Sequence, residues 1–281
     1  MEPVLNLQRS WMTAMGRLIR RASVLFLLLL PVPPLVSAAA SPATARQNIV
    51  TANRVFRAGE RLSYRISWSD ILLAGTAVME IVADRLPDGT NVLRFQSTAR
   101  SSGFVSSFYP VNDTIISVVD AEGLCSLSYS LDQSHGSRKR HRRYTFDQRN
   151  HTVVVRNPDE AGTFSIPPRA QDALSALYYL RSRDALVPGT SVAINVFDSD
   201  KTWAVEVKVL GKERIKTVLG ELDTIKVVTY PRYEGVFQHK GEITMWLTDD
   251  VRKIPVLMKS KISIGSIVST LTGICEGEQA K

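Results

Sequence analysis

Residues 135–146, "HGSRKRHRRYTF", concentrate the side chains with the clearest potential for chemistry. Five of them are lysine or arginine, and the aromatic residues Tyr144 and Phe146 follow directly. The planar guanidinium of arginine matches phosphate groups in a bidentate geometry. Aromatic rings beside cations can stack on nucleic-acid bases. The segment therefore raises two hypotheses, an anionic ligand and a nucleic acid.

The alternation of side chains along a strand divides this basic run between two faces. Arg138, Arg140 and Arg142 then share a face with Tyr144. In one interpretation the strand runs past the rim of its sheet and its charged half is solvated, as charge runs usually are. In the other, the three arginines point into a wet cavity and bind an anionic head group. These four residues are our candidate ligand-binding residues on this strand.

No catalytic or metal-binding motif accompanies the basic run. The four histidines lack HExxH spacing, and no G-x-S-x-G elbow occurs. Ser175 falls in a helical pattern, where a nucleophile would need histidine and acid partners brought from elsewhere in the fold. The sequence thus predicts a protein without a metal, a cofactor or an enzymatic activity.

The two cysteines, Cys125 and Cys275, are too far apart for a CxxC motif. In an oxidising compartment they could form a disulfide, which would contribute roughly 4 to 5 kcal/mol in the chain-entropy model. Two separately buried thiols are the alternative, since cysteine is often inside. Both alternatives stay open at this point.

Period-two alternation dominates the chain from residue 60 onward and predicts the elements that position these residues. In "RLSYRISW", Leu62, Tyr64, Ile66 and Trp68 share one face, as a half-buried strand requires. "GLCSLSYSLDQ", "TWAVEVKVL" and "EITMWLTDD" repeat the pattern, with turn signals between them. The pattern predicts a mainly β fold, an antiparallel half-barrel or barrel of about ten strands.

One segment, "PPRAQDALSALYYLRSR", has helical spacing instead. It follows Pro167 and Pro168, with Asp172 early and Arg181 late, as the helix dipole favours. We expect a single helix of roughly 12 to 14 residues, about 20 Å long, packed at the opening of the barrel.

The functional hypotheses follow from this architecture. A barrel with apolar inward positions could enclose a lipid-like or glycan ligand, with Trp68, Trp203 and Trp246 as candidate lining residues that an ordinary core would explain equally well. The alternatives are a scaffold or interaction module with a filled core, which would use its rim or its basic end to bind a partner, and a hydrolase of unrecognised type.

The N-terminus is typical of a secretory signal peptide over residues 1–40. Four arginines precede the apolar run Val24–Leu30, and small residues ending near Ala40 suit the signal peptidase. Prolines interrupt the run well short of the roughly 20 apolar residues that a membrane-spanning helix needs, so we expect no transmembrane segment in the mature chain. Residues 41–55 read as a flexible lead-in, 56–276 as a single β-rich domain, and 277–281 as a tail.

Export to the periplasm bears on the choice of ligand. The mature chain keeps 31 basic and 26 acidic residues, a net charge of +5. This mild charge and the extracytoplasmic destination argue against nucleic acid and favour lipid-like or anionic components of the cell envelope.

Four stretches in sequence order carry a resemblance to a known family: "AGERLSYRISW", "DALSALYYLR", "GKERIKTVLGELDTIKV" and "MWLTDDVRKIPVLMKSKISIGSI". Together, from about Phe56 to about Gly273, they resemble the bacterial exported family called domain of unknown function 3108. The resemblance implies a β-rich exported domain and brings no established activity. The last stretch is also faintly similar to the strand pairs of periplasmic lipoprotein carriers of the LolA and LolB kind.

Overall fold

The computed structural model describes residues 55–157, 160–233, 236–237, 242–261 and 265–277. All of them belong to one compact unit, Val50–Lys281. The expected signal peptide, nearly all of the flexible lead-in and most of the tail lie outside the described residues.

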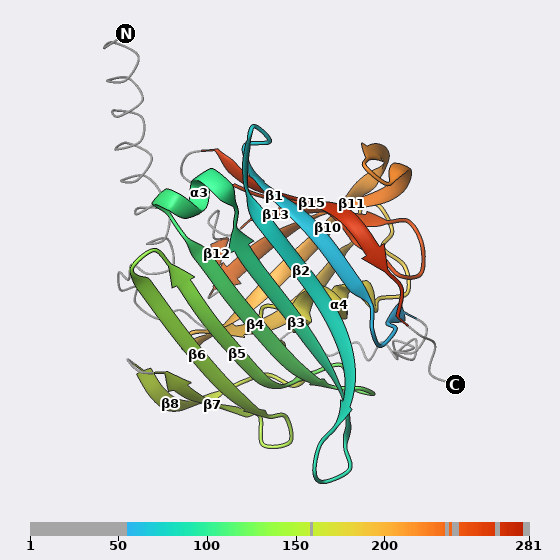
Figure 1. Cartoon of the computed structure of the whole chain (residues 1–281). Helices are drawn as coiled ribbons and strands as arrows, with labels where there is room; N and C mark the ends of the chain where they lie inside the picture. The colour runs from blue at the N-terminus through green and yellow to red at the C-terminus, as the bar shows by residue number, and fades with distance from the viewer. Residues whose placement is uncertain (1–54, 158–159, 234–235, 238–241, 262–264, 278–281) are drawn as a thin grey trace. The chain divides into compact units, whose positions relative to one another are not determined.

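The described residues form fifteen strands in one antiparallel sheet (Figure 1). The strands are β1 (Arg61–Trp68), β2 (Leu72–Arg85), β3 (Asn91–Ser101), β4 (Val111–Asp120), β5 (Ser126–His135), β6 (Arg138–Asp147), β7 (Thr152–Asn157), β8 (Glu160–Ser165), β9 (Ser191–Asp198), β10 (Lys201–Thr217), β11 (Gly220–Tyr233), β12 (Val236–Phe237), β13 (Ile243–Thr248), β14 (Pro255–Lys261) and β15 (Ser266–Cys275). Their order is β8-β7-β6-β5-β4-β3-β2-β1-β15-β14-β13-β11-β10-β9, with β12 beside β11. The predicted mainly β class is confirmed.

Fifteen strands replace the expected ten or so. Two features explain why the alternation of side chains in the sequence did not reveal the additional strands. Register shifts interrupt the ladders of five strand pairs, and each one moves the inward pattern by one residue. In strands such as β3, "NVLRFQSTARS", small polar residues also occupy positions where a core strand would have apolar side chains.

The hydrogen-bonded ladder is not closed, yet side chains from its two ends meet. Phe197 of β9 lies with its ring centroid 5.3 Å from Tyr144 and 6.2 Å from Phe146, both on β6. Gln171 bridges to Val196 of β9 in parallel, so the segment before the second helix covers this edge. The result corresponds to the half-barrel of the sequence prediction, with a seam packed by side chains.

Two helices occur among the described residues, where one was expected: α3 (Gly103–Phe108) and α4 (Ser175–Arg181). The expected helix corresponds to α4, which is shorter than predicted. The first half of the predicted helix, after the two prolines, is not helical. Gln171 pairs with β9 there, and the Asp172 carboxylate accepts the backbone N–H groups of Leu174 and Ser175. Neither helix has the length and hydropathy needed to cross a membrane.

Helix α4 packs on the inner side of the sheet through Tyr178 and Leu180. The Tyr178 ring stacks on Phe95 of β3 at 3.7 Å, and Phe56 meets both rings edge-on. Three apolar clusters make up the described core, two of them in contact with α4 and the third at the seam. The helix thus fills the curve of the sheet.

Candidate functional site

The basic run lies on β6, at the end where β6 extends beyond its neighbour. Residues Arg138–Arg143 pair with β5, whereas β7 pairs only with Tyr144–Asp147. Arg138, Lys139 and Arg140 are exposed. The basic half of β6 is therefore a sheet edge that projects past β7, next to the β5–β6 turn.

The three arginines that parity placed on one face of β6 differ in their surroundings. They alternate along β6 without a register shift, as predicted. The guanidinium of Arg142 forms an ion pair with Asp198 at the end of β9, and 11% of the Arg142 side chain is exposed. Arg138 and Arg140 are exposed beyond this point. Arg142 therefore closes the seam, and a shared ligand for the three arginines stays a prediction.

On the opposite face of β6, Asp132 of β5 contacts Arg143 and His141. The guanidinium of Arg143 donates to both of its carboxylate oxygens at 2.8 Å, and the ring of His141 lies 2.7 Å from one of them. His135 has its own carboxylate, Asp113, at 2.7 Å. Among the described residues, no carboxylate is found within ion-pair distance of Lys139 or Arg140.

Tyr144, a candidate ligand-binding residue, belongs to the seam and is buried. Its hydroxyl accepts the backbone N–H of Ser199 at 3.0 Å and lies 3.5 Å from the Asp198 carboxylate. Burial, followed by the negative charge of Asp198, raises the pKa of Tyr144 to about 12. The hydroxyl therefore stays protonated at physiological pH and acts as a structural bridge between β6 and the β9–β10 turn.

The three candidate tryptophans come from three different strands. Trp68 ends β1, and Trp203 lies near the start of β10 on the face of Val207 and Val209. Trp246 alternates with the buried Met245 and Leu247 of β13 and packs, partly buried, against an apolar cluster. Its indole N–H donates to Glu213, and the ammonium of Lys226 lies 4.8 Å from the ring centroid. A common role in lining a cavity stays a prediction.

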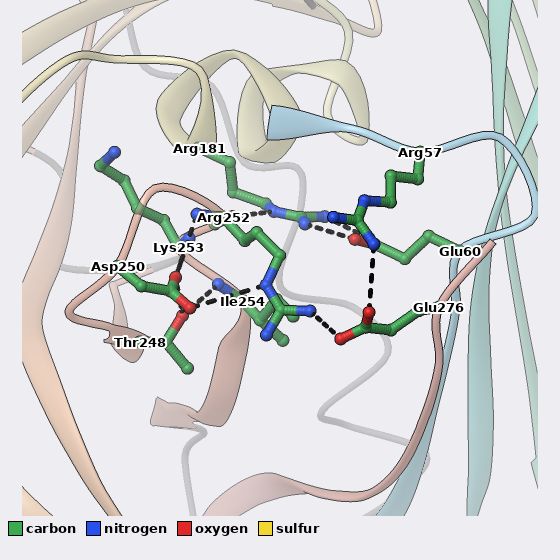
Figure 2. A network of polar contacts seen from close by, with 9 residues as sticks. All are labelled: Arg57, Glu60, Arg181, Thr248, Asp250, Arg252, Lys253, Ile254 and Glu276. Atoms are coloured by element: carbon green, nitrogen blue, oxygen red, sulfur yellow. Dashed lines mark hydrogen bonds and ion pairs between the residues drawn. The ribbon is translucent and has the colours of Figure 1, made fainter. Parts of the chain in front are cut away.

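A second polar site, which sequence reasoning missed, lies at the opposite end of the sheet (Figure 2). Arg181 at the end of α4 donates to both carboxylate oxygens of Glu60, at 2.8 and 3.0 Å, and to the backbone carbonyl of Arg252 at 3.0 Å. Around this buried pair, Glu276 accepts from Arg57 and Arg252. The network ties α4, the segment before β1, the β13–β14 turn and the end of β15 together.

The turn between β13 and β14 is built by Asp250. Its carboxylate accepts the backbone N–H groups of Arg252 and Lys253 and the Thr248 hydroxyl. Burial works against its ionisation, but these donors together with the charge of Arg252 leave the pKa of Asp250 below its usual range. Asp249 pairs with Lys212 of β10. Each aspartate thus has a structural use.

Asp172 forms a third polar centre, which is completely buried. One carboxylate oxygen accepts from the hydroxyls of Ser117 and Ser126, and the other accepts from the backbone of Leu174 and Ser175. Burial without a cationic partner raises the pKa of Asp172 in spite of these donors. The centre joins β4 and β5 to the start of α4.

The hydroxyl of Ser175 is held by structural hydrogen bonds. It contacts Ser126 and the backbone of Asp172 inside the core, with no histidine in these contacts. Within the described residues, no group of three or more histidine, cysteine or acidic side chains could hold a metal ion.

Both cysteines are free thiols in the structure, and they do not form the disulfide that one alternative predicted. Cys125 directly precedes β5, and Cys275 ends β15, with β1 to β4 between them in the sheet. Cys275 is exposed, so the alternative of two buried thiols is wrong for that residue. Burial, together with the nearby charge of Asp120, raises the pKa of the Cys125 thiol.

Among the solved structures to which the chain is similar, one with a TM-score above 0.5 supports the fold. A β-barrel-like protein of the domain of unknown function DUF1849 from Brucella abortus matches with a TM-score of 0.53 and 13% identity, over 80% of this chain and 100% of that one. A candidate exported protein with a YmcC-like fold from Bacteroides fragilis has a TM-score of 0.33 and 10% identity, over 78% and 97% of the two chains. A candidate lipoprotein from Parabacteroides distasonis has a TM-score of 0.35 and 11% identity, over 78% and 95%.

No curated protein matches the chain. A family model does, over residues 63–272. This range contains β2 to β14, α4 with Asp172 and Arg181, and the β13–β14 turn that Asp250 organises, so it spans the elements that the polar centres join. The chain belongs to the family described as protein of unknown function DUF3108.

Proposed function

We propose that this protein is a non-enzymatic binding protein of the bacterial cell envelope that recognises anionic groups through the exposed end of β6. The observation that carries the proposal is the contrast within the basic run. Arg142 and Arg143 are engaged by Asp198 and Asp132, whereas Lys139 and Arg140 are exposed at the projecting edge. Cations kept at a rim without a structural task are suited to a ligand with phosphate or carboxylate groups.

The packing inside the sheet supports rim binding over carriage of a lipid within the barrel. Tyr178 of α4 is stacked on Phe95, and Leu180 packs into a second cluster that includes Val207 and Leu247. An enclosed acyl chain would have to displace these side chains. The filled-core hypothesis needs no such rearrangement.

The absence of an enzymatic role is part of the proposal. The hydroxyl of Ser175 is enclosed among structural hydrogen bonds, and the two histidine–aspartate contacts on β4 to β6 have no nucleophile among their hydrogen-bond partners in the described residues. An envelope location rests on the signal-peptide pattern of residues 1–40 and the exported character that the family resemblance implies.

Binding to two soluble anionic probes tests this function. Isothermal titration with short-chain phosphatidylglycerol below its micelle threshold and with polyuronate would cover the lipid and glycan sources of the same chemistry. Lys139→Ser/Arg140→Ser should weaken binding of at least one probe at least ten-fold, about five-fold for each cation removed. The matched control, Arg214→Ser/Lys216→Ser, removes two exposed cations from the other end of the sheet and should bind as the wild type does. Equal binding by both variants, or no binding of either probe, would overturn the proposal.

A further inference from the structure

Exposed apolar side chains gather at the same end of the sheet as the basic run. Ile71 is 87% exposed, Leu73 50%, Phe104 57% and Phe108 55%. Single exposed apolar residues are common on protein surfaces and need no explanation. Four large ones on two neighbouring segments form a group whose position can be examined.

Backbone contacts connect the segments that carry these residues. Helix α3 lies beside β2 at this end of the sheet (Figure 1). The N–H of Ser102, just before α3, donates to the carbonyl of Ala74 near the start of β2 at 3.1 Å. Within α3, the rings of Phe104 and Phe108 are 4.8 Å apart. The two phenylalanines therefore adjoin the start of β2, which carries Leu73 and follows the turn with Ile71.

The other end of α3 adjoins the basic hairpin. The Tyr109 ring is 6.1 Å from that of His135, and the N–H of Gly136 donates to the carbonyl of Pro110 at 2.8 Å. Lys139 and Arg140 follow on β6, one turn away. We call the apolar side chains of 71–73 and α3, together with the cations of 138–140, the α3 rim.

The core does not account for the two phenylalanines of α3. None of the helix residues is buried, and both rings are more than half exposed. A short helix with exposed aromatic rings near cations matches the two forces that hold a protein at a bilayer surface, apolar insertion and attraction to anionic lipid.

We propose that the α3 rim docks on an anionic lipid bilayer, with Phe104, Phe108 and Ile71 entering the head-group region and Lys139 and Arg140 contacting lipid phosphates. This proposal rests on the proposed function and identifies a lipid bilayer as the source of the anionic groups that the protein recognises. An acidic glycan would use the cations and leave the apolar side chains in water. The apolar half of the rim therefore favours a bilayer.

The acidic side chains beside the rim do not pair with Lys139 or Arg140. Asp70 lies 3.7 Å from Lys259, and Asp113 hydrogen-bonds to the ring of His135. No ion pair among the described residues involves Lys139 or Arg140, so both cations face the solvent at the rim.

Sedimentation with phosphatidylcholine vesicles, with and without phosphatidylglycerol, tests the docking of the mature protein. Phe104→Ser/Phe108→Ser should weaken binding to the anionic vesicles at least ten-fold, since each ring that leaves the interface gives up apolar burial. Val218→Ser/Leu219→Ser is the matched control, because this pair is exposed at the β10–β11 turn on the opposite end of the sheet. The control should bind as the wild type does.

The outcomes separate this inference from the proposed function. Unchanged vesicle binding by the phenylalanine variant, or equal binding of the wild type to vesicles without phosphatidylglycerol, would reject docking through this rim. If Lys139→Ser/Arg140→Ser loses the soluble probes while no protein sediments with vesicles, anion recognition stands and bilayer docking fails. Because α3 buries nothing, unfolding curves of the phenylalanine variant should match those of the wild type and exclude misfolding.

Discussion

Arg181 of α4 and Glu60 before β1 form a bidentate ion pair from which water is excluded. Their side chains are 0% and 5% exposed, and the Arg181 guanidinium lies 5.3 Å from the ring centroid of Phe56 and 5.2 Å from that of Tyr178. Two residues that are 121 positions apart in sequence thus fix the helix to the first strand. The pair is the central element of the network that holds the described fold at this end.

The first prediction concerns this pair. Glu60→Gln should lower the free energy of unfolding by about 3 to 5 kcal/mol, because it leaves the buried Arg181 charge without its partner. Arg181→Met should do the same by stranding the carboxylate. The double variant Glu60→Gln/Arg181→Met should cost less than the sum of the two, since it buries no lone charge. Urea unfolding monitored by circular dichroism measures all three.

An exposed pair provides the control for this cycle. Arg214 and Asp223 are 64% and 66% exposed, and Arg214→Met should leave the unfolding midpoint unchanged within error. Additive effects in the Glu60 and Arg181 double variant would contradict the interpretation, because they would mean that the two side chains do not interact.

Much of the fold was accessible to the sequence because alternation is a local property. Leu62 and Tyr64 are buried as their shared parity predicts, and so are Tyr144 and Phe146. The strand count was not accessible, because register shifts such as that between Val209 and Gly211 break the pattern. A bulge depends on the partner strand, which a single stretch of sequence does not contain.

The site was predictable only in part, for a related reason. Parity placed Arg142 with Tyr144 correctly, but only the fold brings Asp198 to it from 56 residues away. The Glu60 and Arg181 pair left no local signal, since an isolated glutamate and a helix-terminal arginine are ordinary surface residues. In contrast, the spacing of Phe104 and Phe108 in "SGFVSSFYP" could have indicated an exposed aromatic helix face.

The second prediction concerns the pH dependence of stability at Asp172. Burial raises the pKa of this carboxyl above 3.8, so the native state binds its proton more tightly than the unfolded state does. The stability that this contributes is complete below the unfolded pKa and is lost as the pH rises through the folded pKa. Asp172→Asn, which resembles the protonated acid, should therefore gain on the wild type as the pH rises above the unfolded pKa of about 4, by at most about 1.4 kcal/mol per pH unit, and stop gaining once the pH has passed the folded pKa.

Urea titrations of both proteins across this range give the difference directly. Asp172→Ala serves as a comparison that also removes the acceptor for Leu174 and Ser175, and it should be less stable than Asp172→Asn at every pH. If the wild type instead became more stable relative to Asp172→Asn as the pH rises, the prediction would be wrong. The hydroxyls of Ser117 and Ser126 would then stabilise the carboxylate more than burial destabilises it.

The third prediction concerns the seam between β6 and β9. Arg142→Met should lower the free energy of unfolding by about 1 to 3 kcal/mol, because it leaves the largely buried Asp198 carboxylate without its cation. Amide hydrogen exchange should accelerate in β9, whose outer edge has no strand ladder, and remain unchanged in the central strands β1 to β3. Arg143→Met, one residue away, removes an exposed pair with Asp132 and should change neither quantity appreciably. Uniform acceleration over the whole sheet would mean that the seam is not a separate opening unit.

The fourth prediction concerns the thiols. Cys275 is exposed at the end of β15, whereas Cys125 is partly buried and its thiol pKa is raised by burial and by Asp120. Since the thiolate is the reactive form, an aromatic disulfide reagent should modify Cys275 at least about ten-fold faster than Cys125 in the native protein. The fast phase should disappear in Cys275→Ser and persist in Cys125→Ser. When the wild type is unfolded without a reductant, both thiols should react with the reagent. If neither thiol reacted, Cys125 and Cys275 would be joined by a disulfide, which would contradict a fold that places four strands between them.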